Sequence, residues 1–336
     1  MKRLAHKPDI TQIEVPEGAK KAAMPGMVKP MLAKLIDKPF DDEGWLFEIK
    51  WDGYRALANL DKGNVLLYSR NGIVFDKYTE VSDALTKFPF DAILDGEVVA
   101  LDTDGIPKFQ YLQNFETDPS HPLQYQVFDI LYYNGYDLKA VGLAQRKAFL
   151  QKILPKNEVV RYSDHVMGTG IDFFNLVAKM GLEGIVGKKA DSTYQVNKRT
   201  GAWVKIKTGK RQEAIICGYT EPKGSRQYFG SLILGVYEKN ALKWIGSSGG
   251  GFDEESLETI YKKLIKLKQE ASPFGYKITQ KSKIYWVAPK LICEVSFSEW
   301  TDNGSMRHPV FLGLRPDKNP KDVKREKETN TNQIVK

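Results

Sequence analysis

The octapeptide EIKWDGYR, residues 48–55, closes an apolar run with a concentration of charge. In WLFEIKWD, residues 45–52, large apolar side chains alternate with charged ones, and successive side chains on a strand point to opposite faces. The alternation predicts a strand whose buried face carries Trp45, Phe47, Ile49 and Trp51 and whose other face carries Glu48, Lys50 and Asp52. A lysine at a strand end usually extends into water, but this one is aimed between two carboxylates.

Three further short segments also combine an apolar face with charged side chains. The residues that share a face are Asp95 and Glu97 in AILDGEVV, Val186 and Lys188 in EGIVGKK, and Trp203, Lys205 and Lys207 in WVKIK. Glu183 stands at the start of the second of these segments. Each segment alone could be a half-solvated edge strand. Four such strands with lysine, arginine and glutamate grouped on them predict a shared charged site.

These residue types point to chemistry on a nucleotide. Glu97 and Glu183 could hold Mg²⁺ through oxygen ligands, and neighbouring cations would neutralise phosphates. A lysine among other cations has its ammonium pKa lowered, which makes the neutral amine available as a nucleophile. We therefore expect an amine to attack a nucleotide α-phosphate. The sequence contains no GxxxxGK[ST] loop, which excludes a P-loop NTPase.

Composition limits the class of protein. The chain has 336 residues, a formal net charge of +8 and two cysteines, which exclude a disulfide framework and a Cys-rich zinc module. No apolar run approaches the ~18 residues of a membrane span, and no hydrophobic region follows the basic N-terminus. We therefore expect a cytoplasmic protein in a reduced setting, without membrane association. The basic charge suits a polyanionic partner but identifies no site.

The order of patterns predicts an α+β protein of antiparallel sheets and helices, divided into four segments. Residues 1–28 are expected to be an arm or linker, and residues 29–209 the α+β domain. After the basic run KTGKRQ, strands separated by Gly-rich turns, with a helix among them, predict a small barrel of the OB type over residues 210–320. Residues 321–336 are charged, poor in hydrophobic residues and expected to be mobile.

The charged blocks resemble, in order, those of the covalent nucleotidyltransferases: ATP-dependent DNA ligases, RNA ligases and mRNA capping enzymes. The blocks are EIKWDGYR (48–55), SRNG (69–72), LDGEVV (94–99), VFDILYY (127–133), EGIVGKK (183–189), WVKIK (203–207) and FLGLRPDK (311–318). HPVFLGLRPDK and the opening PMLA further resemble the ligase module of bacterial ligase D proteins, which serve non-homologous end joining. The resemblance implies a nucleotidyltransferase (adenylation) domain followed by an OB-fold domain.

The resemblance also implies a role for residues around the base. Lys50 would form the lysyl–AMP phosphoramidate, and Glu48 with the backbone around it would read the adenine. Phe128 would stack on one face of the base and Val186 would pack on the other, although either could be plain core. Asp52 could orient Lys50 by a salt bridge or hydrogen bond.

The remaining implied site residues are charged. Arg55 and Arg70 would contact ribose and phosphate, Glu97 would contact the ribose and a metal, and Glu183 would bind a metal. Lys205 and Lys207 would contact the α-phosphate. When the OB domain closes, the departing pyrophosphate would be bound by Arg315, Asp317 and Lys318. Residues 207–212 are the expected hinge for that closure. The alternative for Arg315 and Asp317 is a surface salt bridge. Asp95 is left outside the site as a residue that only caps a turn.

The implied function is an ATP-dependent DNA ligase that uses Mg²⁺ or Mn²⁺ and seals nicked or broken double-stranded DNA during non-homologous end joining. An RNA ligase or capping enzyme is the alternative within enzymes. A non-catalytic nucleic-acid-binding protein is the alternative from another class. We expect a monomer, either a minimal ligase or a module of a larger polypeptide, helped by an end-binding repair protein or by fused polymerase and nuclease domains.

Overall fold

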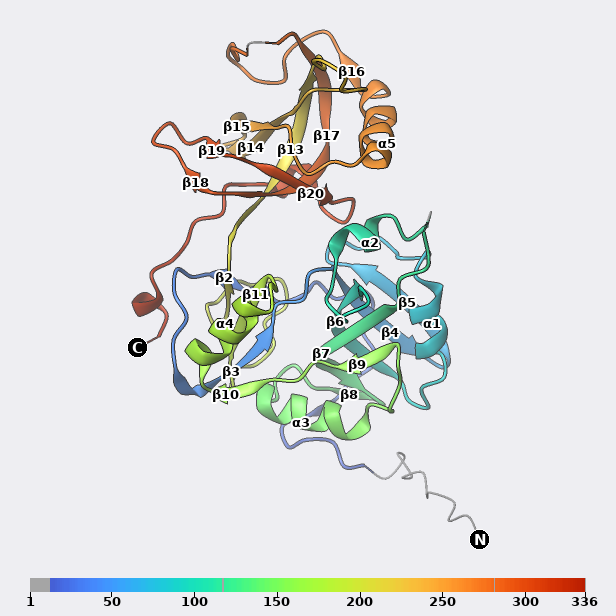
Figure 1. Ribbon diagram of the computed structural model, residues 1–336. Helices are drawn as coiled ribbons and strands as arrows, with labels where there is room; N and C mark the ends of the chain where they lie inside the picture. The colour runs from blue at the N-terminus through green and yellow to red at the C-terminus, as the bar shows by residue number, and fades with distance from the viewer. Residues whose placement is uncertain (1–12, 117, 281, 336) are drawn as a thin grey trace. The chain divides into compact units, whose positions relative to one another are not determined.

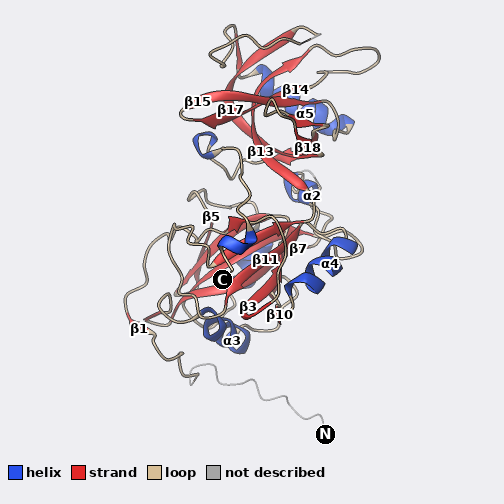
Figure 2. Cartoon of the chain, turned by 90° about the vertical axis from the view of Figure 1, so that its left-hand side faces the viewer, coloured by secondary structure: helices blue, strands red, loops and turns tan. Residues whose placement is uncertain are grey.

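The computed structural model describes residues 13–116, 118–280 and 282–335, and these divide into two compact units. Unit 1 comprises the described residues up to Ile206 together with the segment that begins at Thr329, and unit 2 is Lys207–Glu328 (Figure 1). Residues 1–12 of the predicted arm lie outside the described residues. Figure 2 shows that strands make up most of the regular structure in each unit.

The larger sheet of unit 1, as far as the chain is described, has seven strands in the order β1-β8-β7-β6-β4-β5, with β9 beside β7. Their bounds are β1 (Lys20–Lys21), β4 (Tyr54–Asp61), β5 (Asn64–Ser69), β6 (Ala92–Ala100), β7 (Leu123–Tyr133), β8 (Tyr136–Asp137) and β9 (Val160–Tyr162). The helices of this region are α1 (Thr79–Leu85), α2 (Phe109–Gln113) and α3 (Leu143–Ile153). Neighbouring strands pair antiparallel except β7 and β9, which are parallel.

The second sheet of unit 1 has, among the described residues, five strands in the order β10-β3-β11-β12-β2. Their bounds are β2 (Lys34–Leu35), β3 (Asp42–Ile49), β10 (Val166–Gly168), β11 (Gly184–Lys189) and β12 (Trp203–Lys207). Helix α4 (Gly170–Lys179) packs on β3 and β11.

Both faces of β3 are covered where the sequence predicted one buried face. Trp45 and Phe47 pack in a core cluster with Val177 of α4, as the alternation predicted. Leu46 lies in a different cluster, with Phe128 of β7 and other residues of the larger sheet. Glu48, two residues along, shares that face and is therefore buried between the two sheets.

Unit 2 is built around the antiparallel pair β13 (Lys210–Thr220) and β17 (Ile284–Phe297). Its main sheet, in the part of the chain described, has six strands in the order β15-β14-β13-β17-β16, with β20 beside β17. The other bounds are β14 (Leu232–Glu238), β15 (Ala241–Ser248), β16 (Lys268–Gln269), β18 (Glu299–Trp300), β19 (Met306–Arg307), β20 (Val310–Leu314), α5 (Glu254–Ile265) and the 3₁₀ turn η2 (Pro320–Asp322). Asp253 and Ser256 form a capping box at the start of α5.

The last residues have defined partners where the sequence predicted a mobile charged tail over residues 321–336. Val323 is buried in the core of unit 2. The 3₁₀ turn η3 (Thr331–Gln333) follows the return to unit 1, where Thr331 is buried and Ile334 packs on the cluster beneath α4. A few apolar and hydrogen-bonding residues within this charged stretch are enough to pack it against the rest of the chain.

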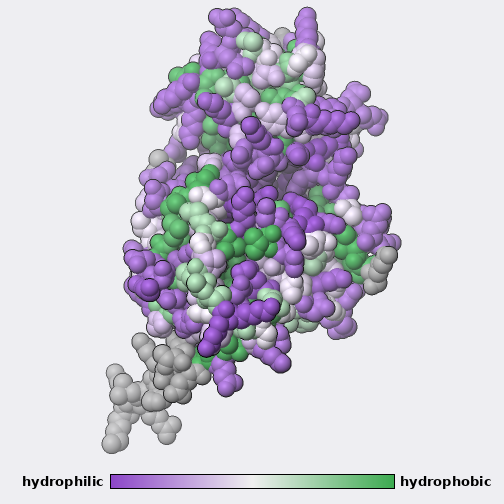
Figure 3. Space-filling model, turned by 180° about the vertical axis from the view of Figure 1, so that it is seen from behind, coloured by the Kyte–Doolittle hydropathy of each residue, from purple (hydrophilic) through white to green (hydrophobic). Residues whose placement is uncertain are grey.

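The surface agrees with the composition. On the face shown in Figure 3, hydrophilic side chains predominate and hydrophobic ones gather in smaller patches. Charged residues make up 27% of the sequence, which accounts for that predominance. Among the described residues, no helix combines the length and apolarity needed to cross a membrane.

Candidate active site

Lys50 follows the last residue of β3 and meets Glu183 at the start of β11. The antiparallel register pairs Ile49 with Ile185, and the Lys50 backbone N–H donates to the Gly184 carbonyl at 2.9 Å. The Lys50 ammonium lies 2.5 Å from the Glu183 carboxylate, which is buried. The structure therefore brings together two of the residues that the sequence assigned to the site.

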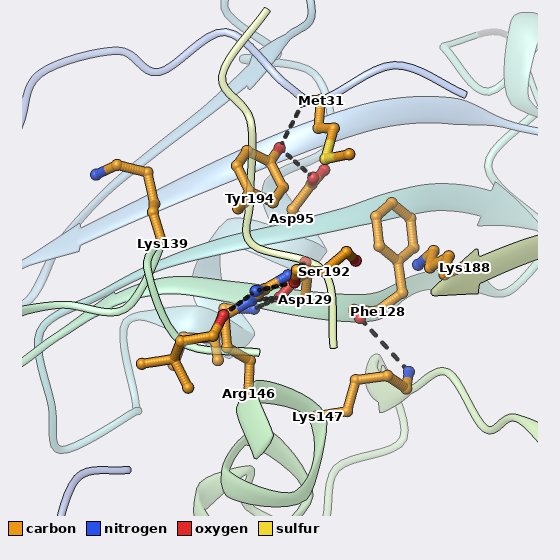
Figure 4. A network of polar contacts seen from close by, with 12 residues as sticks. Met31, Asp95, Phe128, Asp129, Lys139, Arg146, Lys147, Lys188, Ser192 and Tyr194 are labelled. Carbon is orange, nitrogen blue, oxygen red and sulfur yellow. Dashed lines mark hydrogen bonds and ion pairs between the residues drawn. The ribbon is translucent and has the colours of Figure 1, made fainter. Parts of the chain in front are cut away.

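Glu48 lies between two buried lysines. Its carboxylate oxygens are 2.7 Å from the ammonium groups of Lys147 and Lys188. Burial lowers the pKa of Lys188 to about 8, although the Glu48 charge opposes that shift. Lys147 also donates to the carbonyls of Ser163 at 3.0 Å and Phe128 at 3.4 Å, the second of which is drawn in Figure 4. Two ammonium groups thus hold the carboxylate in one orientation.

Lys147 was missed by the sequence reasoning, although its position carried a signal. In α3 the residues at 143, 147 and 150 are spaced as one helical stripe, and all three are buried. A lysine within an otherwise apolar stripe indicates a buried charge that needs a partner.

Phe128 and Trp203 form an aromatic wall beside Glu48. Their rings meet edge to face with centroids 6.3 Å apart. The Lys188 ammonium lies 4.2 Å from the Phe128 centroid and 4.3 Å from that of Trp203, and Figure 4 shows Lys188 beside the Phe128 ring. Val186 stands opposite Glu48 in the β3–β11 ladder. The proposed base-binding residues therefore lie around one carboxylate.

Arg55 is held by Asp95, which does not cap a turn as the sequence suggested. Asp95 lies inside β6, is fully buried and accepts two hydrogen bonds from Arg55, at 2.9 and 2.6 Å. Burial lowers the pKa of Arg55, but the Asp95 charge outweighs it and raises the value overall. The Tyr194 hydroxyl donates to Asp95 at 2.6 Å and accepts from the Met31 backbone at 2.9 Å (Figure 4).

The register places both Asp95 and Glu97 within reach of Arg55. Glu97 is directly opposite Arg55 in the β4–β6 ladder, whereas Asp95 is opposite Leu57. Diagonal neighbours on one face of a sheet are within reach of a long side chain. Glu97 still adds a favourable charge near Arg55.

Three other predicted residues lie on or just after strands of unit 1. Arg70 follows the end of β5, and Asp52 follows the end of β3. Lys205 is half-buried on β12, opposite Leu35 of β2.

Lys207 is the last residue of β12 and the first residue of unit 2. Its ammonium lies 2.8 Å from the Glu326 carboxylate and 3.2 Å from the Arg211 carbonyl. A nearby hydrogen bond of 3.0 Å joins the Glu326 backbone to the Gln212 side chain. The start of β13 and the segment around residue 326 are thus fastened together within unit 2.

Arg315, Asp317 and Lys318 are also paired within unit 2. Arg315 makes two hydrogen bonds of 2.9 Å to Asp317 and one of 2.9 Å to Glu294. The Arg315–Asp317 pair that the sequence left open as an alternative is therefore present, but it is buried, with side chains 11% and 6% exposed. Lys318 lies 3.0 Å from Glu213. Burial raises the pKa of Glu213, but Lys318 and Arg315 outweigh it and lower the value to about 2.

The predicted metal ligands are two carboxylates. Among the described residues no cluster of three or more Asp, Glu, His or Cys side chains has the arrangement of a metal site. Glu183 forms an ion pair with the Lys50 ammonium, and Glu97 lies on the other sheet of unit 1. Carboxylate oxygens with waters completing the shell are the ligands that Mg²⁺ prefers, so this donor set fits a hard cation.

Comparison with known proteins gives consistent matches. The family model described as the ATP dependent DNA ligase domain matches residues 30–207, and the one described as the ATP dependent DNA ligase C terminal region matches residues 225–318. The chain is 37% identical over 317 residues to the "Multifunctional non-homologous end joining protein LigD" of Pseudomonas aeruginosa, covering 91% of this chain and 38% of that protein. It therefore spans about two fifths of the length of that relative.

A shorter relative is matched along almost its whole length. The "SPbeta prophage-derived DNA ligase-like protein LigB" of Bacillus subtilis is 31% identical over 291 residues, which cover 86% of this chain and 99% of that protein. Among solved structures, "mycobacterial DNA ligase D complexed with ATP and MES" matches with a TM-score of 0.68 and 33% identity, over 89% of this chain and 98% of that one.

Proposed function

The chain belongs to the ATP-dependent DNA ligase family, and we propose that Lys50 is the residue that carries AMP between ATP and DNA. In the first step the Lys50 amine attacks the α-phosphorus of ATP, and pyrophosphate leaves. A 5′-phosphate oxygen of DNA then attacks the same phosphorus and releases the lysine. Finally a 3′-hydroxyl attacks the adenylated phosphate, AMP departs and the strand is sealed.

The observation that carries this proposal is the contact between Lys50 and Glu183. Attack requires the neutral amine, so the ammonium must first lose a proton. The Glu183 carboxylate, 2.5 Å away, is the group placed to accept it and to aim the amine. A divalent cation held by Glu97 and Glu183 would neutralise charge on the α-phosphate. Lys205 is proposed to bind an oxygen of the same phosphate, with Arg70 on the ribose side.

We propose that Glu48 accepts a hydrogen bond from the exocyclic amine of adenine, which guanine lacks at that position. Lys147 and Lys188 fix the carboxylate, and a charged acceptor makes a stronger hydrogen bond than a neutral one. Phe128 and Val186 would contact the two faces of the base. Arg55, held in place by Asp95, would contact the ribose.

For unit 2 we propose an OB-fold that meets the pyrophosphate through Arg315, Asp317 and Lys318. That role carries an energetic cost, because Lys318 must exchange its ion pair with Glu213 for a phosphate oxygen. Arg315 already has its guanidinium oriented by Asp317, and such a planar fork suits phosphate oxygens. Lys207 would likewise exchange Glu326 for the α-phosphate, and residues 207–212 are the proposed hinge.

The biological setting that we propose is repair of double-strand breaks by end joining, as a monomer in the bacterial cytosol or nucleoid. The support is the similarity to relatives such as the non-homologous end joining protein LigD of Pseudomonas aeruginosa, of which this chain spans a part. An end-binding protein, or polymerase and nuclease domains, would then raise the local concentration of the ligase at an end.

The experiment that tests the proposed function is labelling with α-labelled ATP or α-labelled GTP, followed by a denaturing gel and sealing assays. We expect label from ATP, dependence on Mg²⁺ or Mn²⁺, and sealing of nicked DNA. Label from GTP alone, or sealing restricted to nicked RNA, would contradict the proposal.

A further inference from the structure

The segment that returns to unit 1 lies along the edge of the sheet that carries Lys205. Strand β2 is only two residues long and pairs in parallel with β12. Ile36, next in the chain, donates from its backbone N–H to the Lys205 carbonyl at 3.1 Å. So short a strand at a sheet edge contributes few hydrogen bonds of its own. The residues that bond to the open side of β2 therefore help to hold β2, and through it β12 with Lys205, in place.

Thr329 occupies that open side. It forms a parallel bridge with Ile36. Its N–H donates to the Leu35 carbonyl at 3.0 Å, and its carbonyl accepts from the Asp37 N–H at 3.2 Å. The returning segment thus extends the sheet beyond β2.

Thr331 fastens the segment in place. Its backbone N–H and its hydroxyl each lie 2.8 Å from the same Asp37 carboxylate oxygen, and the hydroxyl accepts from the Lys38 N–H at 3.2 Å. These hydrogen bonds lower the pKa of Asp37. Ile334 and Val335 then pack on the cluster that contains Val204 of β12. Figure 1 shows the C-terminal end of the chain beside the loop that follows β2.

Residues 329–335 lie outside both family matches, which end at residues 207 and 318. We propose that residues 329–335 are a positioning element of the nucleotide site: by closing the sheet edge beside β2 they hold β12, and with it Lys205, where the α-phosphate binds. The inference rests on the proposed role of Lys205.

The test uses the full chain with Thr331→Val and a matched control, Thr79→Val, at an exposed residue that begins α1 in the same unit and lies outside the proposed element. Self-adenylation is measured against ATP concentration, and binding of a non-reacting ATP analogue by calorimetry. We expect Thr331→Val to raise the ATP concentration for half-maximal labelling about tenfold, the cost of losing one hydrogen bond to a charged group. Thr79→Val should match the wild type.

A second arm asks whether the effect passes through Lys205. In a Lys205→Ala background, Thr331→Val should change analogue affinity by much less than it does alone, because the group that it positions is absent. A chain truncated after Glu328 should regain wild-type ATP dependence when a peptide of residues 329–336 is added.

The outcomes separate this inference from the proposed function. A wild-type chain that takes no label from ATP would remove the proposed function and the inference with it. A labelled wild type with Thr331→Val indistinguishable from Thr79→Val would overturn the inference alone. The inference would also be overturned if Thr331→Val lowered the melting temperature without changing the ATP requirement. The same holds if Thr331→Val changed analogue affinity equally in the wild-type and Lys205→Ala backgrounds.

Discussion

Replacing Asp95 by asparagine should destabilise unit 1, because it removes the charge that balances Arg55 in the interior. Asp95 is fully buried and accepts two hydrogen bonds from Arg55 and one from Tyr194. Breaking a buried ion pair by removing one partner costs about 3–5 kcal/mol. The Arg55 side chain is 21% exposed, so water screens part of its charge, and we expect about 3 kcal/mol. For a unit of this size that is a fall of about 6–12 °C in Tm.

The assay is differential scanning calorimetry of the full chain, in which the two units need not melt together. Asp83→Asn, an exposed carboxylate of α1 in the same unit, is the matched control and should leave the Tm unchanged. Adding Arg55→Met to Asp95→Asn should recover much of the loss, since no unpaired charge then remains. If Asp95→Asn and Asp83→Asn melt alike, the reasoning about this ion pair is refuted.

Two further predictions concern the base site and acid stability. Phe128→Leu, which keeps most of the core volume, should raise the ATP concentration for half-maximal labelling by about 5–150-fold with little loss at saturation, since aromatic stacking on a base is worth ~1–3 kcal/mol. An unchanged ATP requirement would contradict stacking. Because the pKa of Glu213 falls from its ordinary 4.5 to about 2 on folding, unit 2 should lose stability as the pH drops from about 4.5 to about 2, and calorimetry of Glu213→Gln should show a weaker dependence in that window. A variant with the wild-type acid dependence would count against the pair of Glu213 and Lys318.

The alternation of side chains along single strands predicted where Glu48 and Lys50 point, because that direction is set by the strand itself. Alternation in residues 45–52 placed Glu48 and Lys50 on one face, and the structure puts Glu48 between the sheets and Lys50 against Glu183. The motif at 183–189 supplied that partner. The strand nevertheless ends at Ile49, earlier than the alternation suggested, although the Lys50 N–H still bonds to the Gly184 carbonyl, one residue further along the β3–β11 ladder.

The missed features depend on packing between distant segments. Lys147 reaches Glu48 only because α3 lies against β7, a contact that strand alternation cannot predict. The pairing of Asp95 with Arg55, where the sequence predicted only a turn cap, depends on a diagonal across the β4–β6 ladder. The tail was predicted from its average composition, whereas its seating depends on particular residues such as Thr331 and Ile334.

The central claim is that Lys50 is the nucleophile, and peptide mapping by mass spectrometry after incubation with ATP and Mg²⁺ tests it most directly. We expect one adenylate, attached to Lys50 and lost on acid treatment that cleaves a phosphoramidate. Lys50→Ala and Lys50→Arg should take no label, the second because a guanidinium stays protonated, while the exposed Lys87→Ala should label normally. Adenylate on another residue, or label retained by Lys50→Ala, would contradict the account.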